Sequence, residues 1–387
     1  MNEIKIGLMG LNFFSGNLGC AALAYSFRSI LEAAAEQADV NLRVTVFTKE
    51  RNLDFERSCS SFITEEVCRY SFRSLSTIKD FARVASEQDC IFDFTEGDSF
   101  SDMYGAKRFG LDLYLKRVAE KRCARFVLGP QTYGPYESWL SGKLASGCIK
   151  RASSIYSRDK QSTDLVEELT GIKPKTTTDV ALGLPYTRGN KLETAIGINV
   201  SGLLWHGGYT GDNQFGLKVD YRSYCRGIIR AFLDRGLDVR LIAHVFGNGD
   251  SPDEDYSVCT DLQSEYPECL VAPYFKTPIE AKSYISTLGG FTGARMHATI
   301  AAFSSGVPTV PFAYSKKFGG LFGSLGYDYV VDGRELNTNE AVELTTKYLL
   351  DDQSLQTAQN SALMIASSEL DRFKSDITDL LVSVSAM

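Results

Sequence analysis

The most informative segment of the sequence is residues 290–299, which read Gly-Phe-Thr-Gly-Ala-Arg-Met-His-Ala-Thr. A short strand, a glycine turn at Gly293 and a helix that begins near Met296 form the strand-to-helix corner of an α/β unit. Arg295 and His297 stand at this corner, where free backbone N–H groups and the helix dipole favour an anion. A guanidinium fits carboxylate or phosphate in two parallel hydrogen bonds, and an imidazole can donate to phosphate or exchange a proton. We expect an anion-binding corner; an ordinary helix start with a solvated arginine is the alternative.

Short apolar runs alternate with amphipathic stretches on both sides of this corner. In the C-terminal half, the predicted strands are residues 195–200, 239–244, 270–274, 290–292 and 309–312, and the predicted helices are 221–235, 279–286, 298–305 and 318–325. In the N-terminal half, the predicted strands are 4–10, 43–47, 90–94, 125–128 and 154–157, and the predicted helices are 21–35, 78–85, 111–120, 140–151 and 160–169. Strands followed by helices in this order predict right-handed crossovers and parallel sheets.

A weakly patterned stretch, Leu184–Glu193, contains several turn-forming residues and predicts a linker. We therefore expect an α/β protein of two Rossmann-like parallel-sheet domains, residues 1–188 and 189–365. A C-terminal helix, 366–387, is expected to pack back on the N-terminal domain. Ligands of open parallel sheets bind beyond the carboxyl ends of the strands. Two such sheets facing a cleft give the GT-B-like architecture that we expect here.

The composition excludes several classes of protein. The 387 residues are 44% hydrophobic and 23% charged, which is typical of a folded protein with two cores, and the formal charge of -7 argues against a nucleic-acid surface. The nine scattered cysteines form no C-x-x-C and there are only three histidines, which argues against a disulfide framework or a zinc site. No stretch approaches the ~20 apolar residues that cross a bilayer. We expect a cytoplasmic protein with no metal, no nucleic-acid partner and no transmembrane segment.

A glycine-rich turn, Gly10–Gly19, follows the first predicted strand and opens the first helix. Its glycine spacing is not that of the G-x-G-x-x-G nucleotide fingerprint. Gly16, Asn17 and Gly19 would let backbone amides approach a substrate closely, or would form a purely structural turn.

An acidic cluster follows the predicted strand at residues 90–94. Residues 93–102 read Asp-Phe-Thr-Glu-Gly-Asp-Ser-Phe-Ser-Asp. Asp98 and Asp102 could accept a proton from a sugar hydroxyl or bind several hydroxyls by hydrogen bonds. The alternative is a loop whose acidic residues cap turns.

Polar residues also follow several other predicted strands. Arg158 is either a ligand contact or half of an internal ion pair. Asn199 and Ser201 come at the end of one strand and His244 at the end of the next, where a lone histidine is as often a satisfied core residue as a functional one. Lys317 is either a phosphate ligand or part of a solvated helix start.

Taken together, these segments resemble the polysaccharide pyruvyl transferase family. The resemblance rests on the order and the strand-end positions of Gly16–Gly19, Gly97–Asp102, Pro130–Pro135, Ser157–Asp159, Asn199–Gly202, His244–Val245, Arg295–His297, Ser305–Pro308 and Tyr314–Lys317. It implies a GT-B-like fold, phosphoenolpyruvate as the donor and a sugar of a surface polysaccharide pathway as the acceptor.

The resemblance also implies roles for single residues. The family's Arg-x-His pair matches Arg295 and His297, which implies that they hold the phosphate and carboxylate of the donor in the C-terminal domain. Its Arg-Asp motif implies a second anion contact at Arg158, and its lysine after a tyrosine turn implies another at Lys317.

Two departures from the family's pattern concern the acceptor. Cys20 stands where an aspartate is usual, and Thr95–Ser99 replaces a common Gly-Gly-Gly-Ser loop. Both lie in the domain expected to hold the acceptor. The sequence leaves open whether that acceptor is lipid-linked, nucleotide-linked or polymeric, and whether the protein attaches peripherally to the inner face of the membrane.

The implied reaction needs no metal or redox cofactor. His297 would contact the donor or protonate its methylene carbon, and Asp98 or Asp102 would deprotonate the attacking hydroxyl. Fixed positive charges would stabilise the phosphate and carboxylate. Two alternatives share the fold: a GT-B glycosyltransferase with a nucleotide-sugar donor, and a non-catalytic sugar- or phosphate-binding relative.

Overall fold

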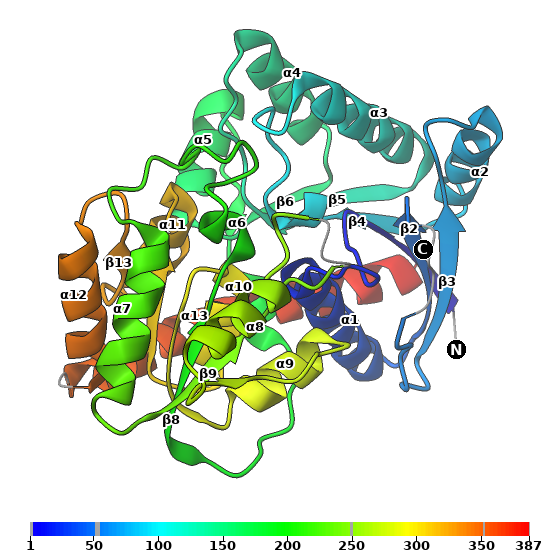
Figure 1. The fold of residues 1–387 in the computed structure, drawn as a ribbon. Coiled ribbons are helices and arrows are strands. Elements are labelled where there is room, and N and C mark those ends of the chain that lie inside the picture. Colours follow the sequence, from blue (N-terminus) through cyan, green and yellow to red (C-terminus); the bar gives the residue numbers. More distant parts are fainter. Residues whose placement is uncertain (1–2, 51–54, 248–250, 351–352, 387) are drawn as a thin grey trace. The chain divides into compact units, whose positions relative to one another are not determined.

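The structure is a computed structural model that describes residues 3–50, 55–247, 251–350 and 353–386 (Figure 1). The chain divides into two compact units. The N-terminal unit comprises residues 1–14, 23–180 and 367–387, and the C-terminal unit comprises residues 15–22 and 181–366.

The N-terminal unit is built on a seven-stranded sheet of order β3-β2-β1-β4-β5-β6-β7. Its strands are β1 (Glu3–Met9), β2 (Asn41–Thr48), β3 (Ile63–Arg69), β4 (Cys90–Asp93), β5 (Arg125–Gln131), β6 (Ser154–Ser157) and β7 (Lys175–Thr176). Its helices are α1 (Leu18–Ala38, whose first turn belongs to the C-terminal unit), α2 (Leu75–Ala85), α3 (Ala106–Arg122), α4 (Trp139–Ile149) and α5 (Lys160–Thr170). The central strand β4 is buried along its whole length, as expected for a parallel strand covered on both faces.

The C-terminal unit is built on a six-stranded sheet of order β10-β9-β8-β11-β12-β13. Its strands are β8 (Leu192–Asn199), β9 (Asp238–Ile242), β10 (Leu270–Val271), β11 (Leu288–Gly293), β12 (Thr309–Ala313) and β13 (Val331–Asp332). Its helices are α6 (Gly202–Trp205), α7 (Tyr221–Leu233), α8 (Tyr256–Glu265), α9 (Pro278–Ile285), α10 (Met296–Ser304), α11 (Lys316–Ser324) and α12 (Thr338–Leu350). A last helix, α13 (Ser354–Ser385), begins in this unit and ends in the N-terminal one.

The expectation of two parallel-sheet α/β domains is confirmed, because every strand pair in the described residues is parallel. In a parallel sheet the carboxyl ends of neighbouring strands share one edge, so the loops that follow them come together there. Each unit therefore offers one such edge for a site.

The second half of the glycine-rich turn after β1, from Ser15, belongs to the C-terminal unit, whereas the sequence predicted that the whole turn lies in the N-terminal domain. Asn17 forms an antiparallel bridge with Val245. The Leu18 N–H donates to the His244 carbonyl at 3.0 Å, and the Phe246 N–H donates to the Gly16 carbonyl at 2.8 Å. These main-chain hydrogen bonds attach the turn to the loop that follows β9.

The division of the chain after Val180 comes before the expected boundary at residues 188 and 189. The reason lies on α9, where the buried Lys282 ammonium donates to the carbonyls of Leu182, at 3.2 Å, and Leu184, at 2.8 Å. These bonds hold the start of the expected linker to the C-terminal unit.

The end of α13, from Ser367, belongs to the N-terminal unit. Phe373 is buried there against Phe27 and Tyr156, with ring centroids 6.1 and 4.9 Å away. Asp376 accepts hydrogen bonds from the Tyr156 hydroxyl and from Lys175.

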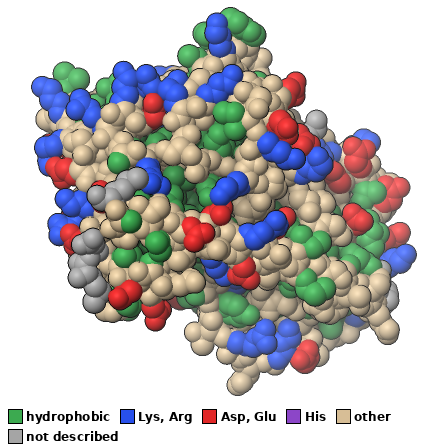
Figure 2. All heavy atoms as spheres, turned by 180° about the vertical axis from the view of Figure 1, so that it is seen from behind, with side chains coloured by type: hydrophobic (Ala, Val, Ile, Leu, Met, Phe, Trp, Pro, Cys, Tyr) green, Lys and Arg blue, Asp and Glu red, His purple; other side chains and the backbone are tan. Residues whose placement is uncertain are grey.

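Neither unit offers a hydrophobic helix of membrane-spanning length within the described residues. Basic and acidic side chains are interspersed over much of the face shown in Figure 2.

Candidate active site

The corner after β11 lies at the carboxyl edge of the C-terminal sheet, and we call residues Gly293–His297 the β11 corner. A Cβ atom on Gly293 would lie 2.5 Å from the Cβ of Asn199, so only glycine allows the two strand ends to approach this closely. The Asn199 amide accepts from the Arg295 N–H at 2.8 Å and donates to the Ile242 carbonyl at 2.9 Å. Asn199 thus fixes the β11 corner to its neighbouring strands instead of facing a ligand.

Arg295 is buried, and its guanidinium is neutralised within the protein. Its Nη2 lies 2.7 Å from Asp255 Oδ1, and its Nη1 lies 2.7 Å from Asp253 Oδ1. Burial alone would lower the pKa of Arg295, but Asp255 and Asp253 raise it above its ordinary value. The sequence predicted that Arg295 holds the donor directly; the structure shows its guanidinium bound by two carboxylates, and the contact with the donor stays a prediction.

Asp255 joins the loops at three strand ends. Its carboxylate accepts from the N–H groups of Gly202 at 2.8 Å and of His244 and Val245 at 3.0 Å each, in addition to Arg295. Sequence reasoning missed this residue. No local pattern marks it, because its loop lies forty positions before Arg295 in the sequence.

His297 lies in the first turn of α10, against the glycine turn at residues 15–22. The position of a Cβ on Gly19 is only 2.6 Å from His297 Nδ1, so a side chain at Gly19 would displace the ring. The Asn17 side chain accepts from the Gly19 N–H at 3.0 Å, and a Cβ on Gly16 would overlap the Phe246 carbonyl. The turn predicted to bind substrate therefore shapes the environment of His297.

His244 is buried beneath the same corner. Its pKa is lowered to about 3, by burial first and then by the nearby His297 and Arg295. His244 is therefore uncharged at neutral pH and adds no positive charge to the site. Ser201, the other predicted residue of this edge, is also structural, because its hydroxyl accepts from the Leu204 N–H at 3.4 Å and caps α6.

Three helices of this unit start without a hydrogen bond from the side chain of the N-cap residue, in the part of the chain that the structure describes. In α8 the Glu254 carboxylate accepts from the N–H groups of Tyr256 and Ser257 instead, which leaves two neighbouring helices without a cap. They are α10, which follows β11 and has Arg295 at its N-cap, and α11, which follows β12 and has Ser315 there. In contrast, the side chains of Asp220 and Thr277 cap α7 and α9. An uncapped helix start presents backbone N–H groups and the positive end of the helix dipole, which favour an anion. Lys317 lies in the first turn of α11, but its side chain is outside the described part of the structure.

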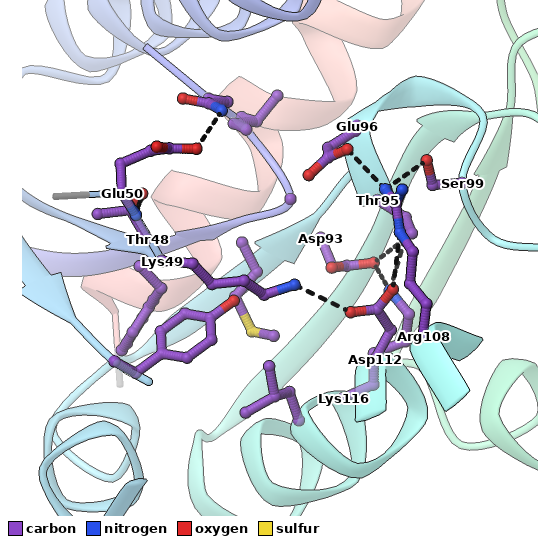
Figure 3. Close-up of a pocket in the computed structure, with 17 residues that line it drawn as sticks. Thr48, Lys49, Glu50, Asp93, Thr95, Glu96, Ser99, Arg108, Asp112 and Lys116 are labelled. Carbon is purple, nitrogen blue, oxygen red and sulfur yellow. Dashed lines mark hydrogen bonds and ion pairs between the residues drawn. The ribbon is translucent and has the colours of Figure 1, made fainter. Parts of the chain in front are cut away.

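The N-terminal unit has its own pocket, of about 600 Å³ including space open to solvent, at the carboxyl ends of β1, β2 and β4 (Figure 3). We call it the N-terminal pocket. Its charged lining residues are Lys49, Glu50, Asp93, Glu96, Arg108, Asp112 and Lys116.

The floor of the N-terminal pocket is a buried ion pair between Asp93 at the end of β4 and Lys116 on α3. The Thr95 hydroxyl donates to Asp93 Oδ2 at 2.8 Å and accepts from Lys116 Nζ at 2.5 Å. All three side chains are satisfied by one another, so they form a rigid base rather than free ligands.

On the more exposed side of the pocket, the ion pairs are partly accessible to solvent. Arg108 donates to Glu96 at 2.8 Å and to Ser99 at 3.1 Å. Figure 3 shows Lys49 reaching across the pocket to Asp112 on α3, where Nζ and Oδ1 are 3.4 Å apart. Partly exposed carboxylates and ammonium groups of this kind can exchange partners with the hydroxyls of a sugar.

The loop that carries the acidic cluster has an unusual backbone. Thr95, Glu96 and Gly97 have φ values of 44°, 54° and 85° in succession, and a left-handed conformation is uncommon for a β-branched residue. The Glu96 N–H donates to the Gly10 carbonyl at 2.7 Å, and a Cβ on Gly10 would overlap the Thr95 backbone. Strained residues of this kind gather at functional sites.

Two predicted site residues near this loop, Arg158 and Asp102, form hydrogen bonds or ion pairs with other residues of the protein. Arg158 Nη1 lies 2.7 Å from the buried Asp179, and its Nε donates to Thr132 at 2.8 Å, so the internal ion pair is present, and the anion contact stays a prediction. Asp102 accepts from the N–H groups of Glu137 and Ser138, at 2.8 and 3.2 Å.

Asp102 and Asp98 differ in how their carboxylates are used. Burial alone would raise the pKa of Asp102, but hydrogen bonds from Glu137, Ser141 and Ser138 lower it, which suits a turn cap better than a base. Asp98 is half-buried and accepts from the Tyr104 hydroxyl at 3.3 Å. Its neighbours Glu96 and Ser99 line the N-terminal pocket.

Among the residues that the structure describes, His, Cys, Asp and Glu side chains form no group of three that could hold a metal ion.

The sequence matches one family model, described as polysaccharide pyruvyl transferase, over residues 17–316. This range includes the β11 corner, the glycine turn from Asn17 and the acidic cluster. No curated protein sequence matches the chain.

Several solved structures share the fold at low sequence identity. TcCGT1 in complex with UDP has a TM-score of 0.57 at 10% identity, over 100% of this chain and 99% of that one. Sucrose-phosphate synthase from Thermosynechococcus elongatus has a TM-score of 0.55 at 12% identity, over 99% of both chains. UDP-GlcNAc 2-epimerase from Methanocaldococcus jannaschii has a TM-score of 0.54 at 7% identity, over 95% of this chain and 99% of that one. The predicted GT-B-like fold is thereby confirmed, and at these identities the likeness concerns the fold alone.

Proposed function

Because the chain belongs to the polysaccharide pyruvyl transferase family, we propose that it transfers a pyruvyl group from phosphoenolpyruvate to two hydroxyls of a sugar. The products are a cyclic ketal and inorganic phosphate. Phosphoenolpyruvate is a co-substrate in this proposal, and no cofactor takes part.

One observation carries the proposal for the donor: two adjacent helices, α10 and α11, start uncapped at the ends of neighbouring strands, with His297 in the first turn of α10. Phosphoenolpyruvate has two anionic groups, a phosphate and a carboxylate. Two helix starts at one sheet edge offer each group its own set of backbone N–H donors. The neutralised Arg295 holds this backbone in place through Asp255.

In the proposed reaction, His297 protonates the methylene carbon of the donor, which becomes the methyl group of the product. The positive charge that develops at the adjacent carbon is attacked by one sugar hydroxyl, whose proton passes to a carboxylate. Phosphate leaves as the C–O bond to it breaks, the second hydroxyl attacks the same carbon to close the ketal, and the proton of that hydroxyl passes to the departing phosphate. The helix starts stabilise the departing phosphate, because their donors are fixed before the reaction begins.

The N-terminal pocket is the proposed acceptor site. Its carboxylates and ammonium groups lie around an open space at a strand edge, where they can bind several hydroxyls of one sugar ring. We propose Asp98 as the base, because Asp102 is already occupied by two main-chain donors.

Phosphate release tests this function directly. Purified protein with phosphoenolpyruvate and a panel of β-galactosides or mannosaminides should release phosphate, and mass spectrometry should find the ketal on one acceptor. His297→Ala should reduce the release roughly 100-fold or more, as expected for loss of a general acid. His206→Ala, at an exposed histidine of the same unit, is the matched control. Release of UDP or GDP from nucleotide sugars, without phosphate release from phosphoenolpyruvate, would replace this function by glycosyl transfer.

A further inference from the structure

Helix α4 of the N-terminal unit exposes three large apolar side chains in its first two turns and buries small ones there, although Ile149 at its end is buried. Ser141, Gly142 and Ala145 are buried against the unit, whereas Trp139 is 77%, Leu140 56% and Leu144 49% exposed. A helix that only covers a core would show the opposite arrangement. Three large apolar side chains on one or two turns of a helix form a contiguous patch, which indicates a surface for a partner.

The same part of the chain is strongly basic in an acidic protein. Between Ala106 and Arg151 there are ten Lys and Arg residues and three Asp and Glu residues, a net of +7, whereas the whole chain has a formal charge of -7. The remaining residues therefore carry a net of -14. Not all of this excess is at the surface, because Lys116 is buried against Asp93 and Arg108 is paired with Glu96. The exposed Lys107, Lys121, Arg122, Lys143 and Lys150 still indicate an anionic partner for this segment.

The few acidic residues of this segment do not neutralise the surface of α4. Residues 139–151 contain no Asp or Glu. Asp112 lines the N-terminal pocket, and Glu120 is shared by Arg117 and Arg151. The third acidic residue of the segment is Glu137, just before α4.

The basic and apolar side chains lie on adjoining helices. α3 packs against α4, and the Arg151–Glu120 pair, at 2.8 Å, joins the end of α4 to α3. We call the exposed side chains of both helices the α3/α4 face; it consists of Lys107, Tyr114, Lys121, Arg122, Trp139, Leu140, Lys143, Leu144 and Lys150. In Figure 2, hydrophobic and basic spheres adjoin at the top of the molecule, the end of the N-terminal unit where Figure 1 places α4. On the other flank of α4, helix α5 exposes Asp164, Glu167 and Glu168, which bound the face on that side.

We propose that the α3/α4 face binds the surface of a lipid bilayer that contains anionic headgroups. Lysine and arginine side chains attract such headgroups, and an exposed tryptophan beside leucines inserts at the level where headgroups meet acyl chains. Lys143 lies with its ammonium 4.9 Å from the Trp139 ring centroid, so a charge and an aromatic ring are offered at the same place. A nucleic acid would use the basic side chains but would leave Leu140 and Leu144 without a role.

Co-sedimentation with vesicles tests the proposal. The protein should bind vesicles of phosphatidylcholine mixed with phosphatidylglycerol, bind phosphatidylcholine vesicles much less, and lose binding as NaCl is raised. Lys143→Glu with Lys150→Glu should weaken binding roughly tenfold or more, and Trp139→Ala with Leu140→Ala by a similar factor. The matched controls are Lys276→Glu, at an exposed lysine of the C-terminal unit, and Leu75→Ala, at a leucine of α2 that is 82% exposed.

Fluorescence gives a second readout that reports on one residue. The chain has two tryptophans, Trp139 and Trp205, so Trp205→Phe leaves Trp139 as the single reporter. Its emission should shift to shorter wavelength when anionic vesicles are added, and should stay unchanged with phosphatidylcholine vesicles.

Four results would overturn the proposal. They are equal binding to both kinds of vesicle, no binding to either, tighter binding of double-stranded DNA or heparin through the same lysines, and burial of Trp139 in a dimer at sedimentation equilibrium. Phosphate release with a water-soluble acceptor should be the same in the α4 variants as in the parent protein. Failure of the proposed reaction would therefore be visible separately from failure of membrane binding.

Discussion

Arg295 lies where water cannot solvate its charge, so the carboxylates of Asp255 and Asp253 are needed to stabilise it. Arg295→Ala would leave Asp255 buried without its counter-ion, and we expect a loss of about 3–5 kcal/mol in the free energy of unfolding, measured with urea. Arg240→Ala, at a partly exposed pair with Asp238, is the control and should cost less than about 1 kcal/mol. Unchanged stability together with a higher KM for phosphoenolpyruvate would mean that Arg295 contacts the donor after all.

Because His244 is buried, it makes the stability of the folded protein depend on pH. Burial lowers its folded-state pKa to about 3, below the 6.5 of an unperturbed histidine. Between these values the unfolded chain binds a proton that the folded one does not, so stability decreases as the pH falls below about 6.5. At pH ~5 the loss from this residue is about 2 kcal/mol.

Urea denaturation at pH ~7 and ~5 measures this effect. His244→Gln should show a smaller loss of stability between the two pH values than the parent protein does. His206→Gln, at an exposed histidine, should behave as the parent does. The same pH dependence in His244→Gln and in the parent protein would contradict the assignment.

The sequence identified many chemically important residues of the C-terminal unit but not their partners. Arg295 and His297 could be found because a strand, a glycine and a helix start coincide there. Asp255 could not, because nothing local shows that a loop forty positions earlier returns to this guanidinium. Lys116 and Arg108 were missed for a related reason: both lie within a helix, and their pocket forms only when the strands assemble.

At the scale of elements, Lys282 attaches helix α9 to the segment that enters the C-terminal unit. Burial lowers its pKa to about 7, from the ordinary 10.5. Between these values the unfolded chain binds the extra proton, so the contribution of Lys282 to stability increases with pH. The free energy of unfolding of the parent protein should therefore rise more between pH ~7 and ~9 than that of Lys282→Met. Lys276→Met is the control at an exposed lysine, and equal slopes in the parent and Lys282→Met would refute the assignment.

The elements that the sequence predicted well are the buried ones. The predicted strands at residues 90–94, 125–128 and 309–312 correspond to β4, β5 and β12, each an apolar run covered on both faces. The elements that it missed lack this signal. β3 is an edge strand with Thr64, Glu66 and Arg69 exposed, and β13 has only two residues.

Helices α8 and α12 were missed although they are of ordinary length. Their sequences are polar, and only a few positions of each face the core. Their position in the fold is set by packing against the sheet of the C-terminal unit, which no local pattern reveals.

At the scale of the whole molecule, the end of α13 completes the core of the N-terminal unit. Phe373→Ala would empty the space between Phe27 and Tyr156, and we expect a loss of about 3–5 kcal/mol in the free energy of unfolding. Met364→Ala, at a position of the same helix that is 69% exposed, should change it by no more than about 0.5 kcal/mol. Denaturation of the two variants side by side measures the difference, and similar small losses in both would show that the helix end contributes little.

The glycine turn at residues 15–22 has a consequence for synthesis on the ribosome. Asn17 and Gly19 emerge early, but Val245 and Phe246, to which their turn is bonded, are translated more than two hundred residues later. Domains that fold during translation usually close in the order in which they are made. Here the environment of His297 cannot form until the nascent chain includes both the glycine turn and residues 245–246. A fragment of residues 181–366 would lack the glycine turn.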